Sequence, residues 1–135
     1  MSGLKTTTLF NEKYCEVRYD EENKIVIARW KGFLTLEQIT TGCKVVNDAI
    51  KNNKLTLHIS DQSLLKVLSK EAQEFLTGTW FGQVDKLVLK KIAILVAEDI
   101  FAQASVNKVN MLSKYNELQM NTVQTEEQCY FWLKQ

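Results

Sequence analysis

Polar and apolar residues alternate along Tyr14–Asp20, and apolar residues then dominate Ile25–Trp30. The alternation, with Cys15 and Val17 on one side, is typical of a strand buried on one face. The second run is almost continuously apolar, which indicates a more deeply buried strand. Because only a short polar turn separates the two runs, we predict an antiparallel hairpin. Gly32 follows it and is expected to adopt a positive φ at the end of the second strand.

An amphipathic helix is predicted directly after this hairpin. Thr35 and Gln38 have the spacing of a capping box, in which each side chain accepts a hydrogen bond from a backbone amide of the other residue. Asn52 and Asn53 end the apolar pattern. The helix is expected to bury one stripe with alternating spacings of three and four residues, formed by Leu36, Ile39, Cys43, Val46 and Ile50.

A third strand and a second helix follow. Leu55–Ile59 alternates and predicts a strand that ends before the polar residues Ser60–Ser63. Ser69 is expected to be the N-cap of the next helix, since a serine oxygen readily accepts from a first-turn amide. That helix is predicted to end at Gly78 or Gly82.

The second half of the chain contains its most apolar run, Ile92–Ala97. Hydrophobicity on both faces predicts a central strand covered by helices on both sides. A helix carrying Ile100 and Phe101 is expected next, and then a weaker strand at Asn116–Val123. Thr125 begins a second capping box and the last helix, which should bury Cys129, Trp132 and Leu133.

The predicted order is β-β-α-β-α-β-α-β-α. Strands that alternate with helices indicate a mostly parallel sheet with right-handed crossovers, and the initial hairpin makes it mixed. The sequence thus predicts a single α/β domain with a mixed five-stranded sheet and four helices. We assign residues 1–11 to an N-terminal tail and residues 12–135 to the domain.

The charge balance argues against nucleic-acid binding. The 135 residues include 17 Lys and Arg against 16 Asp and Glu, which gives a net charge of +1. No basic block is available to follow a phosphate backbone. A net charge near zero also removes repulsion between copies, which favours a homodimer. No apolar run reaches the roughly 18 residues of a membrane span, and the N-terminus lacks the apolar centre of a signal peptide, so we expect no membrane insertion and a cytoplasmic location.

The sequence offers few residues for catalysis. Cys15, Cys43 and Cys129 lie in apolar patterns with no CxxC spacing, so we interpret them as buried free thiols in a reducing compartment. His58, the single histidine, lies on a strand, where packing or a hydrogen bond is a simpler role than general-base catalysis. One histidine and three scattered cysteines do not form a zinc site. The chain contains no GxGxxG or Walker pattern, and we predict neither a cofactor nor an enzyme.

Two features allow more than one interpretation. Trp80 and Phe81 lie between Gly78 and Gly82, and they belong either to the core or to a surface that binds a partner or ligand. Ser69 is accounted for as a plain N-cap, but phosphate would be tolerated at a helix N-terminus, which leaves a phosphorylation site as the alternative.

Taken together, these elements resemble the SpoIIAA-like, STAS-related domains that occur as small stand-alone bacterial proteins. The resemblance covers roughly residues 12 to 135 and concerns mostly structural motifs. In anti-sigma-factor antagonists of this type, a strand ends in Asp, and a Ser at the start of the next helix is the phosphorylated switch. Those two positions match Asp61 and Ser69 in this sequence. The antagonists usually have a second Asp directly before the Ser, where this chain has Leu68. The residues that carry the resemblance are Trp30, Gly32, Thr35, Gln38, Asp61, Ser69, Thr125, Glu126, Glu127, Trp132 and Leu133.

The resemblance implies a non-enzymatic regulatory or protein-interaction module with an unidentified protein partner. We expect contact around Asp61–Ser69, including Ser63, and at the aromatic pair Trp80 and Phe81. The family is also similar to CRAL-TRIO lipid carriers, so a carrier for a small apolar or lipid ligand is the alternative hypothesis.

Overall fold

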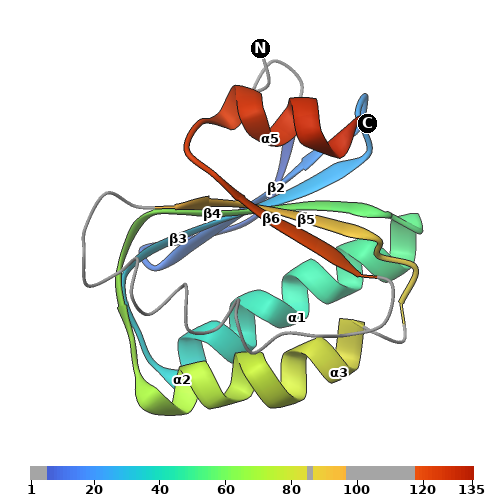
Figure 1. Ribbon diagram of the computed structural model, residues 1–135. Coiled ribbons are helices and arrows are strands. Elements are labelled where there is room, and N and C mark those ends of the chain that lie inside the picture. The colour runs from blue at the N-terminus through green and yellow to red at the C-terminus, as the bar shows by residue number, and fades with distance from the viewer. Residues whose placement is uncertain (1–5, 85–86, 97–117) are drawn as a thin grey trace.

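A computed structural model describes residues 6–84, 87–96 and 118–135, in which one six-stranded sheet has the order β1-β2-β3-β4-β5-β6 (Figure 1). The first three strands pair antiparallel, and β3 through β6 pair parallel. The sheet is therefore mixed, as the initial hairpin predicted. Its strands are β1 (Thr6–Glu12), β2 (Cys15–Asp20), β3 (Ile25–Leu34), β4 (Leu57–Leu68), β5 (Lys91–Val96) and β6 (Gln119–Val123).

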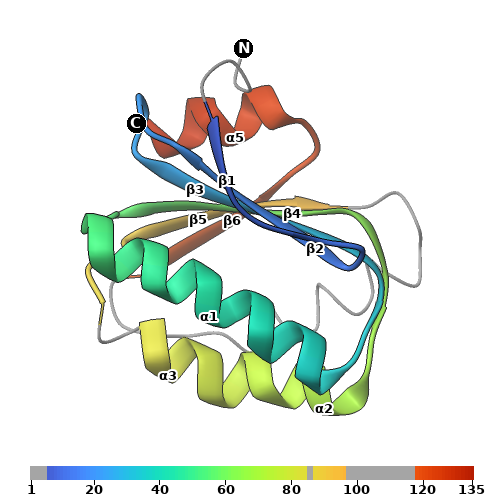
Figure 2. The same ribbon diagram turned by 180° about the vertical axis from the view of Figure 1, so that it is seen from behind.

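Helices cover both faces of the sheet. The long helix α1 (Leu36–Asn53) lies against one face together with a continuous helical segment that comprises α2 (Lys70–Glu74), η1 (Phe75–Trp80) and α3 (Phe81–Val84). The last helix, α5 (Glu126–Leu133), lies on the opposite face (Figures 1 and 2). The domain thus has three layers, with apolar residues on both sides of the sheet, as expected for parallel strands.

The prediction for the most apolar strand is confirmed. In β5, Ile92 and Ile94 pack in the core beneath α1 and η1, whereas Ala93 and Leu95 pack in a second core beneath α5. All four side chains are buried because the strand lies inside the sheet between β4 and β6.

The predicted number of strands was wrong by one. The sequence analysis placed residues 1–11 in a tail, but Thr6–Glu12 forms the edge strand β1 and pairs with β2. Most β1 side chains are exposed, and those of Thr6 and Phe10 are half-buried. A strand with so little buried surface lacks the apolar alternation by which strands are recognised.

The predicted end of the third strand was also wrong. The polar residues Ser60–Ser63 indicated a loop, but β4 continues to Leu68. Ser60 and Asp61 are paired on both sides, with β3 and with β5. Ladder hydrogen bonds on two sides keep the backbone extended whatever the polarity of the side chains.

The glycines do not end the second helical segment. Gly78 lies within η1 and Gly82 within α3, and the segment continues to Val84. A glycine inside a helix costs only about 1 kcal/mol, which packing of the buried Trp80 and Val84 can offset. The third predicted helix, with Ile100 and Phe101, lies outside the described residues.

The capping predictions are confirmed for both helices. In α1, Thr35 Oγ1 accepts from the Gln38 amide and Gln38 Oε1 accepts from the Thr35 amide. Thr125 and Gln128 repeat the arrangement in α5. Within the predicted stripe of α1, Leu36 is exposed because it occupies the first helical position, beyond the edge of the core; Ile39, Cys43, Val46 and Ile50 are buried.

Gly32 has the expected positive φ, at 70°, although it lies inside β3 rather than at its end. The pairing register between β3 and β4 shifts directly after it. We call Lys31–Leu34 of β3 together with Leu64–Leu68 of β4 the arm, because beyond Gln62 the described partner of β4 is β3 alone.

Candidate functional site

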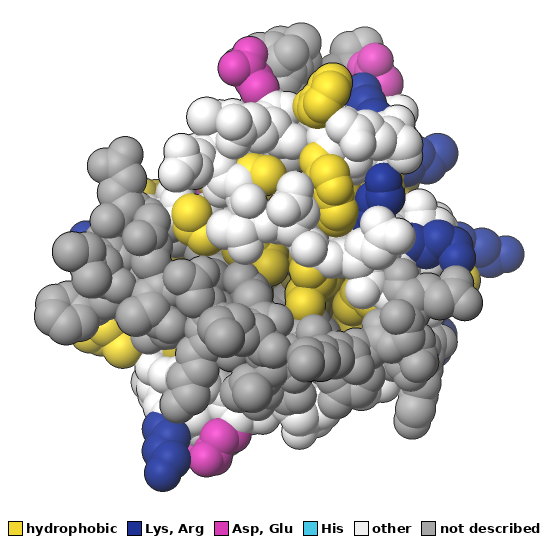
Figure 3. Space-filling model, viewed as in Figure 1, with side chains coloured by type: hydrophobic (Ala, Val, Ile, Leu, Met, Phe, Trp, Pro, Cys, Tyr) yellow, Lys and Arg dark blue, Asp and Glu magenta, His cyan; other side chains and the backbone are white. Residues whose placement is uncertain are grey.

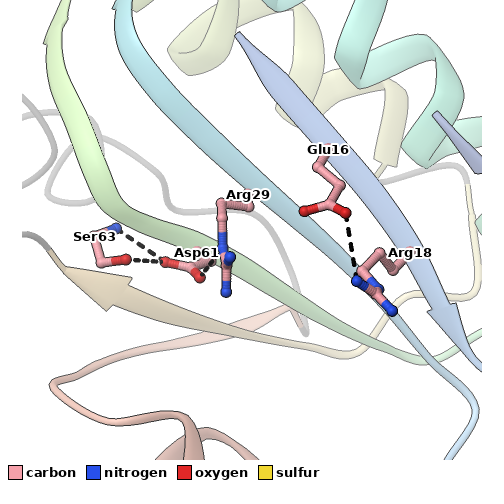
Figure 4. A network of polar contacts seen from close by, with 5 residues as sticks. All are labelled: Glu16, Arg18, Arg29, Asp61 and Ser63. Atoms are coloured by element: carbon pink, nitrogen blue, oxygen red, sulfur yellow. Dashed lines mark hydrogen bonds and ion pairs between the residues drawn. The ribbon is translucent and has the colours of Figure 1, made fainter. Parts of the chain in front are cut away.

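A polar network lies on the face of the sheet that α5 covers (Figure 4). Arg29 Nε lies 2.9 Å from Asp61 Oδ2, and the other carboxylate oxygen accepts from the Ser63 amide at 3.0 Å and the Ser63 hydroxyl at 2.6 Å. The adjacent pair Glu16 and Arg18, 3.4 Å apart, continues the row of charges across β2. The network explains why a carboxylate is tolerated inside a central strand, since both of its oxygens have donors.

The buried thiols are not activated as nucleophiles. Burial and, to a smaller extent, the negative charge of Asp61 raise the pKa of the Cys129 thiol to about 12. Burial likewise raises the pKa of Cys15 to about 12 and that of Cys43 well above its ordinary value. All three thiols are buried and free, as predicted, and they stay protonated at neutral pH.

The opposite face of β4 presents a second polar row. His58, Ser60 and Gln62 alternate along the strand and line a cavity between the sheet, α1 and η1. The cavity has a volume of about 40 Å³. The remaining wall is mostly apolar, and it is formed by Trp30, Leu34, Ile39, Cys43, Val46, Leu65, Leu68, Leu76, Trp80, Ile92, Ile94 and Met120.

The chemistry of His58 is fixed by its neighbours. Its Nδ1 lies 2.8 Å from the carbonyl oxygen of Val26, and a carbonyl only accepts, so Nδ1 carries the proton. Burial lowers the pKa of His58 to about 4, although the hydrogen bond to Val26 acts in the other direction. The imidazole is therefore neutral at pH 7, and its Nε2 is a hydrogen-bond acceptor.

Gln62 has an unsatisfied atom. Its Nε2 donates to Ser60 Oγ at 2.8 Å, but its Oε1 is buried and has no hydrogen-bond partner among the described residues. An unpaired buried acceptor is costly and rare in folded proteins, so it needs a physical explanation.

Two tryptophans form the aromatic part of the cavity wall. Trp80 is buried, and its indole N–H donates to Asn47 Oδ1 at 3.0 Å. Trp30 is also buried and lies against Gly42 of α1. Of the two interpretations of Trp80 that the sequence allowed, the structure thus shows the core position, at the wall of a cavity. Phe81 begins α3, but its side chain lies outside what the structure describes.

Ser69 is the N-cap of α2, as predicted. Its Oγ accepts from the Ala72 amide at 3.0 Å, and its own amide donates to Leu34 O. Capping accounts for the residue at this position, and phosphorylation stays a hypothesis.

Substitution of Ser69 tests the cap. Ser69→Ala is expected to lower the free energy of unfolding by about 1 kcal/mol, because the Ala72 amide loses its acceptor. Ser69→Asp keeps an acceptor and should lie within about 0.5 kcal/mol of the wild type. Urea denaturation of the three proteins measures both values. Equal stability of the alanine variant and the wild type would show that the cap contributes nothing.

The outer face of the arm carries exposed apolar side chains. Phe33 is 72% exposed and Leu64 is 51% exposed. The register pairs Phe33 with Val67 and Lys31 with Leu64, so these residues share one face of the two strands. The other face of the arm buries Leu34, Leu65 and Leu68 against the cavity.

A shallower hollow lies beside α5. Its wall is mostly amide and hydroxyl side chains, with Phe131 and Trp132. Figure 3 shows scattered apolar side chains around α5 on this face rather than one continuous patch. Among the described residues no group of three His, Cys, Asp or Glu side chains is placed to hold a metal ion.

The structure thus separates the residues that the sequence analysis grouped into one contact surface. Asp61 and Ser63 are in contact beneath α5, Ser69 caps a helix at the end of the arm, and Trp80 lies on the other side of the sheet. Sequence reasoning missed Arg29 and Gln62. The two-residue spacing of 58, 60 and 62 could have indicated a polar row, had β4 been predicted at its full length.

A comparison with solved structures supports the fold assignment. An uncharacterized protein of the DUF3478 family from Shewanella loihica PV-4, described as having a SpoIIAA-like fold, matches with a TM-score of 0.59. The chain has a SpoIIAA-like fold. The match covers 96% of this chain and 92% of that one at 14% sequence identity, so the SpoIIAA-like likeness concerns the fold alone. No family model and no curated protein matches the sequence. None of the helices in the described part of the chain is both long and apolar enough to span a bilayer.

Proposed function

We propose that this SpoIIAA-like chain is a non-enzymatic regulatory module of the STAS-related type, and that it acts through protein contact at the outer face of the arm. The observation that carries the proposal is the exposure of Phe33 and Leu64 on adjacent strands. Exposed aromatic and aliphatic side chains that lie together are typical anchors of a protein interface. Leu64 belongs to the stretch Asp61–Ser69, where the sequence analysis expected the partner contact.

The chemistry of the described residues supports a role without catalysis. The three thiols have raised pKa values, and the single histidine is neutral and buried. Asp61 is held by Arg29 and Ser63, so it is engaged in structure. None of these groups combines access, a suitable pKa and a hydrogen-bonded partner in the way a nucleophile or general base requires.

The first partner that we propose is a second copy of this chain. The net charge of +1 opposes association only weakly. Size-exclusion chromatography with light scattering should show a dimer that dissociates on dilution. Phe33→Ala should raise the dissociation constant at least about tenfold if Phe33 is an anchor of the interface.

Phe131 offers a matched control, because it is 72% exposed like Phe33 but lies on α5. Phe131→Ala should leave the dissociation constant unchanged. A wild type that is monomeric at every concentration would refute self-association through the arm. An equal effect of the two variants would show that the contact is not specific to the arm.

The cavity favours a second function, binding of a small apolar ligand. Its wall combines two tryptophans with a polar row, a combination typical of ligand pockets. The cavity volume of about 40 Å³ holds roughly three water-sized spheres, which is too little for a lipid chain. A small molecule therefore fits this site better than a lipid does.

A further inference from the structure

We propose that the end of the sheet at which the parallel strands begin is a second binding surface, and that it fits an acidic segment of a partner protein. This surface is distinct from the arm, because β3 begins beside it and ends in the arm. The proposal therefore goes beyond the protein contact proposed above and does not depend on it.

The fold brings together lysines that are far apart in the sequence. β3, β4 and β5 are adjacent and parallel, so their first residues lie side by side. The amides of Lys90 and Lys91 both donate to Thr56 O, which places these lysines next to the start of β4. The helices α1 and α5 end on the same side of the molecule, at the right of Figure 1, where Figure 3 shows basic side chains gathered. We call this group the basic end, and it consists of Lys24, Lys51, Lys54, Lys90, Lys91 and Lys134.

Most lysines of the basic end are available to a partner. Lys91 is half-buried, and its Nζ is engaged by the carbonyl oxygens of Trp132 and Gln135, but the other five lysines are exposed. None of the six forms an ion pair with a described residue. The exposed carboxylates nearest to them in the chain are Glu21 and Glu22, in the turn before β3. Positive charge therefore predominates at this end.

Backbone conformation indicates that these charges have a purpose. Among the described residues, Lys24 and Lys54 are the two non-glycine residues with a positive φ, at 58° and 53°. Glycine or asparagine is more usual in this conformation, because most side chains are strained there. The dipole of α1 favours a cation at Lys54, its C-cap, but Lys24 lies in a turn and caps no helix. Local structure thus explains only one of these two lysines.

The charge of the rest of the chain favours a short acidic segment as the partner. The chain has 17 Lys and Arg against 16 Asp and Glu, so outside the basic end 11 basic residues stand against 16 acidic ones. Duplex DNA and an anionic bilayer are much larger than the basic end and would also meet this acidic surface. A short acidic segment can contact the basic end alone.

The type of cation points the same way. The basic end contains lysines and no arginine. Arginine is the usual choice for phosphate, because its planar fork donates two parallel hydrogen bonds, whereas lysine is a flexible point charge. Carboxylates on a flexible segment therefore fit this surface better than a phosphate backbone does.

A fluorescein-labelled peptide of about eight glutamates is a suitable probe. Fluorescence anisotropy with the full chain should show saturable binding at about 20 mM salt. Binding should be lost at about 500 mM salt, because exposed charges are then screened within a few ångströms.

Two double variants locate the contact. Lys24→Gln with Lys54→Gln should weaken binding about tenfold, because two exposed charge contacts are lost. Lys13→Gln with Lys70→Gln removes the same charge from exposed positions near the arm and should change the affinity less than about twofold. Should glutamine disturb the fold, Lys24→Gly with Lys54→Gly replaces it, since glycine is unstrained at positive φ.

Three outcomes would overturn the proposal. Equal loss of affinity in the two glutamine variants would show that the contact is not at the basic end. A wild type that does not bind the peptide at low salt would exclude the surface as a whole. Tighter binding of duplex DNA or of phosphatidylserine vesicles in the same buffer would overturn the choice of an acidic protein segment.

Discussion

Gly42→Ala is expected to lower the free energy of unfolding by about 1–3 kcal/mol, although alanine forms helices better than glycine. A Cβ at this position would lie 2.5 Å from Cη2 and 2.6 Å from Cζ3 of the Trp30 ring, and 3.2 Å from Cys15 Sγ. Both neighbours are buried in the core beneath α1, so neither can move without disturbing its own contacts. Urea denaturation measures the loss directly.

Gly82 provides the matched control within a helix. A Cβ at Gly82 would meet nothing within 4 Å, and its φ is not in the left-handed region. Gly82→Ala should therefore leave stability unchanged or raise it by up to about 1 kcal/mol. If Gly42→Ala is as stable as the wild type, Trp30 does not need the close approach of α1 that the structure shows.

Acidification is expected to lower the free energy of unfolding by up to about 3 kcal/mol through His58 alone. Burial lowers the pKa of this residue from 6.5 to about 4 in the folded chain. Between these two values the unfolded chain binds a proton at His58 and the folded chain does not. The contribution is therefore fully present above pH 6.5. It is lost progressively as the pH falls toward 4.

His58→Asn separates this effect from other titrations, since its amide can donate to Val26 but does not titrate in this range. The pH dependence of urea unfolding between pH 6.5 and 4 should be much weaker in the variant. The hydrogen bonds of Asp20 outweigh its burial and lower its pKa below 3.8, so its contribution is lost at more acidic pH. An unchanged pH dependence in His58→Asn would refute the assignment to His58.

The local features of the fold were predictable from the sequence because each depends on neighbouring residues. The capping boxes at Thr35 and Thr125 require only a spacing of three residues. The hairpin and β5 follow from apolar periods within single segments. The SpoIIAA-like fold assignment rested on the order of such elements.

The full length of β4 depends on its neighbours and could not be predicted in this way. Ser60 and Asp61 have the composition of a turn, but pairing with β3 and β5 keeps them in a strand. The same error concealed the cavity. Once β4 was ended at Ile59, His58 stood alone, and its alternation with Gln62 could not be recognised.

The inward orientation of Trp80 and the network of Asp61 have the same origin. Trp80 donates to Asn47, and Asp61 accepts from Arg29, which in both cases is more than thirty residues earlier in the chain. Asn47 and Arg29 reach these partners because α1 and β3 pack beside them in the fold. No local sequence pattern encodes such packing. The sequence therefore identified both residues as unusual, but it placed Asp61 in a loop and left Trp80 open between the core and a binding surface.

The position of α5 has a consequence for the order in which the domain can be completed. Ile25, Ile59 and Leu95 are covered by Cys129 and Leu133 of α5, which follows all six described strands, and Tyr130 donates to Asp20 at 2.8 Å. During synthesis the apolar surface of this face thus stays open until α5 has left the ribosome. A chain that lacks α5 would present this surface to chaperones and proteases.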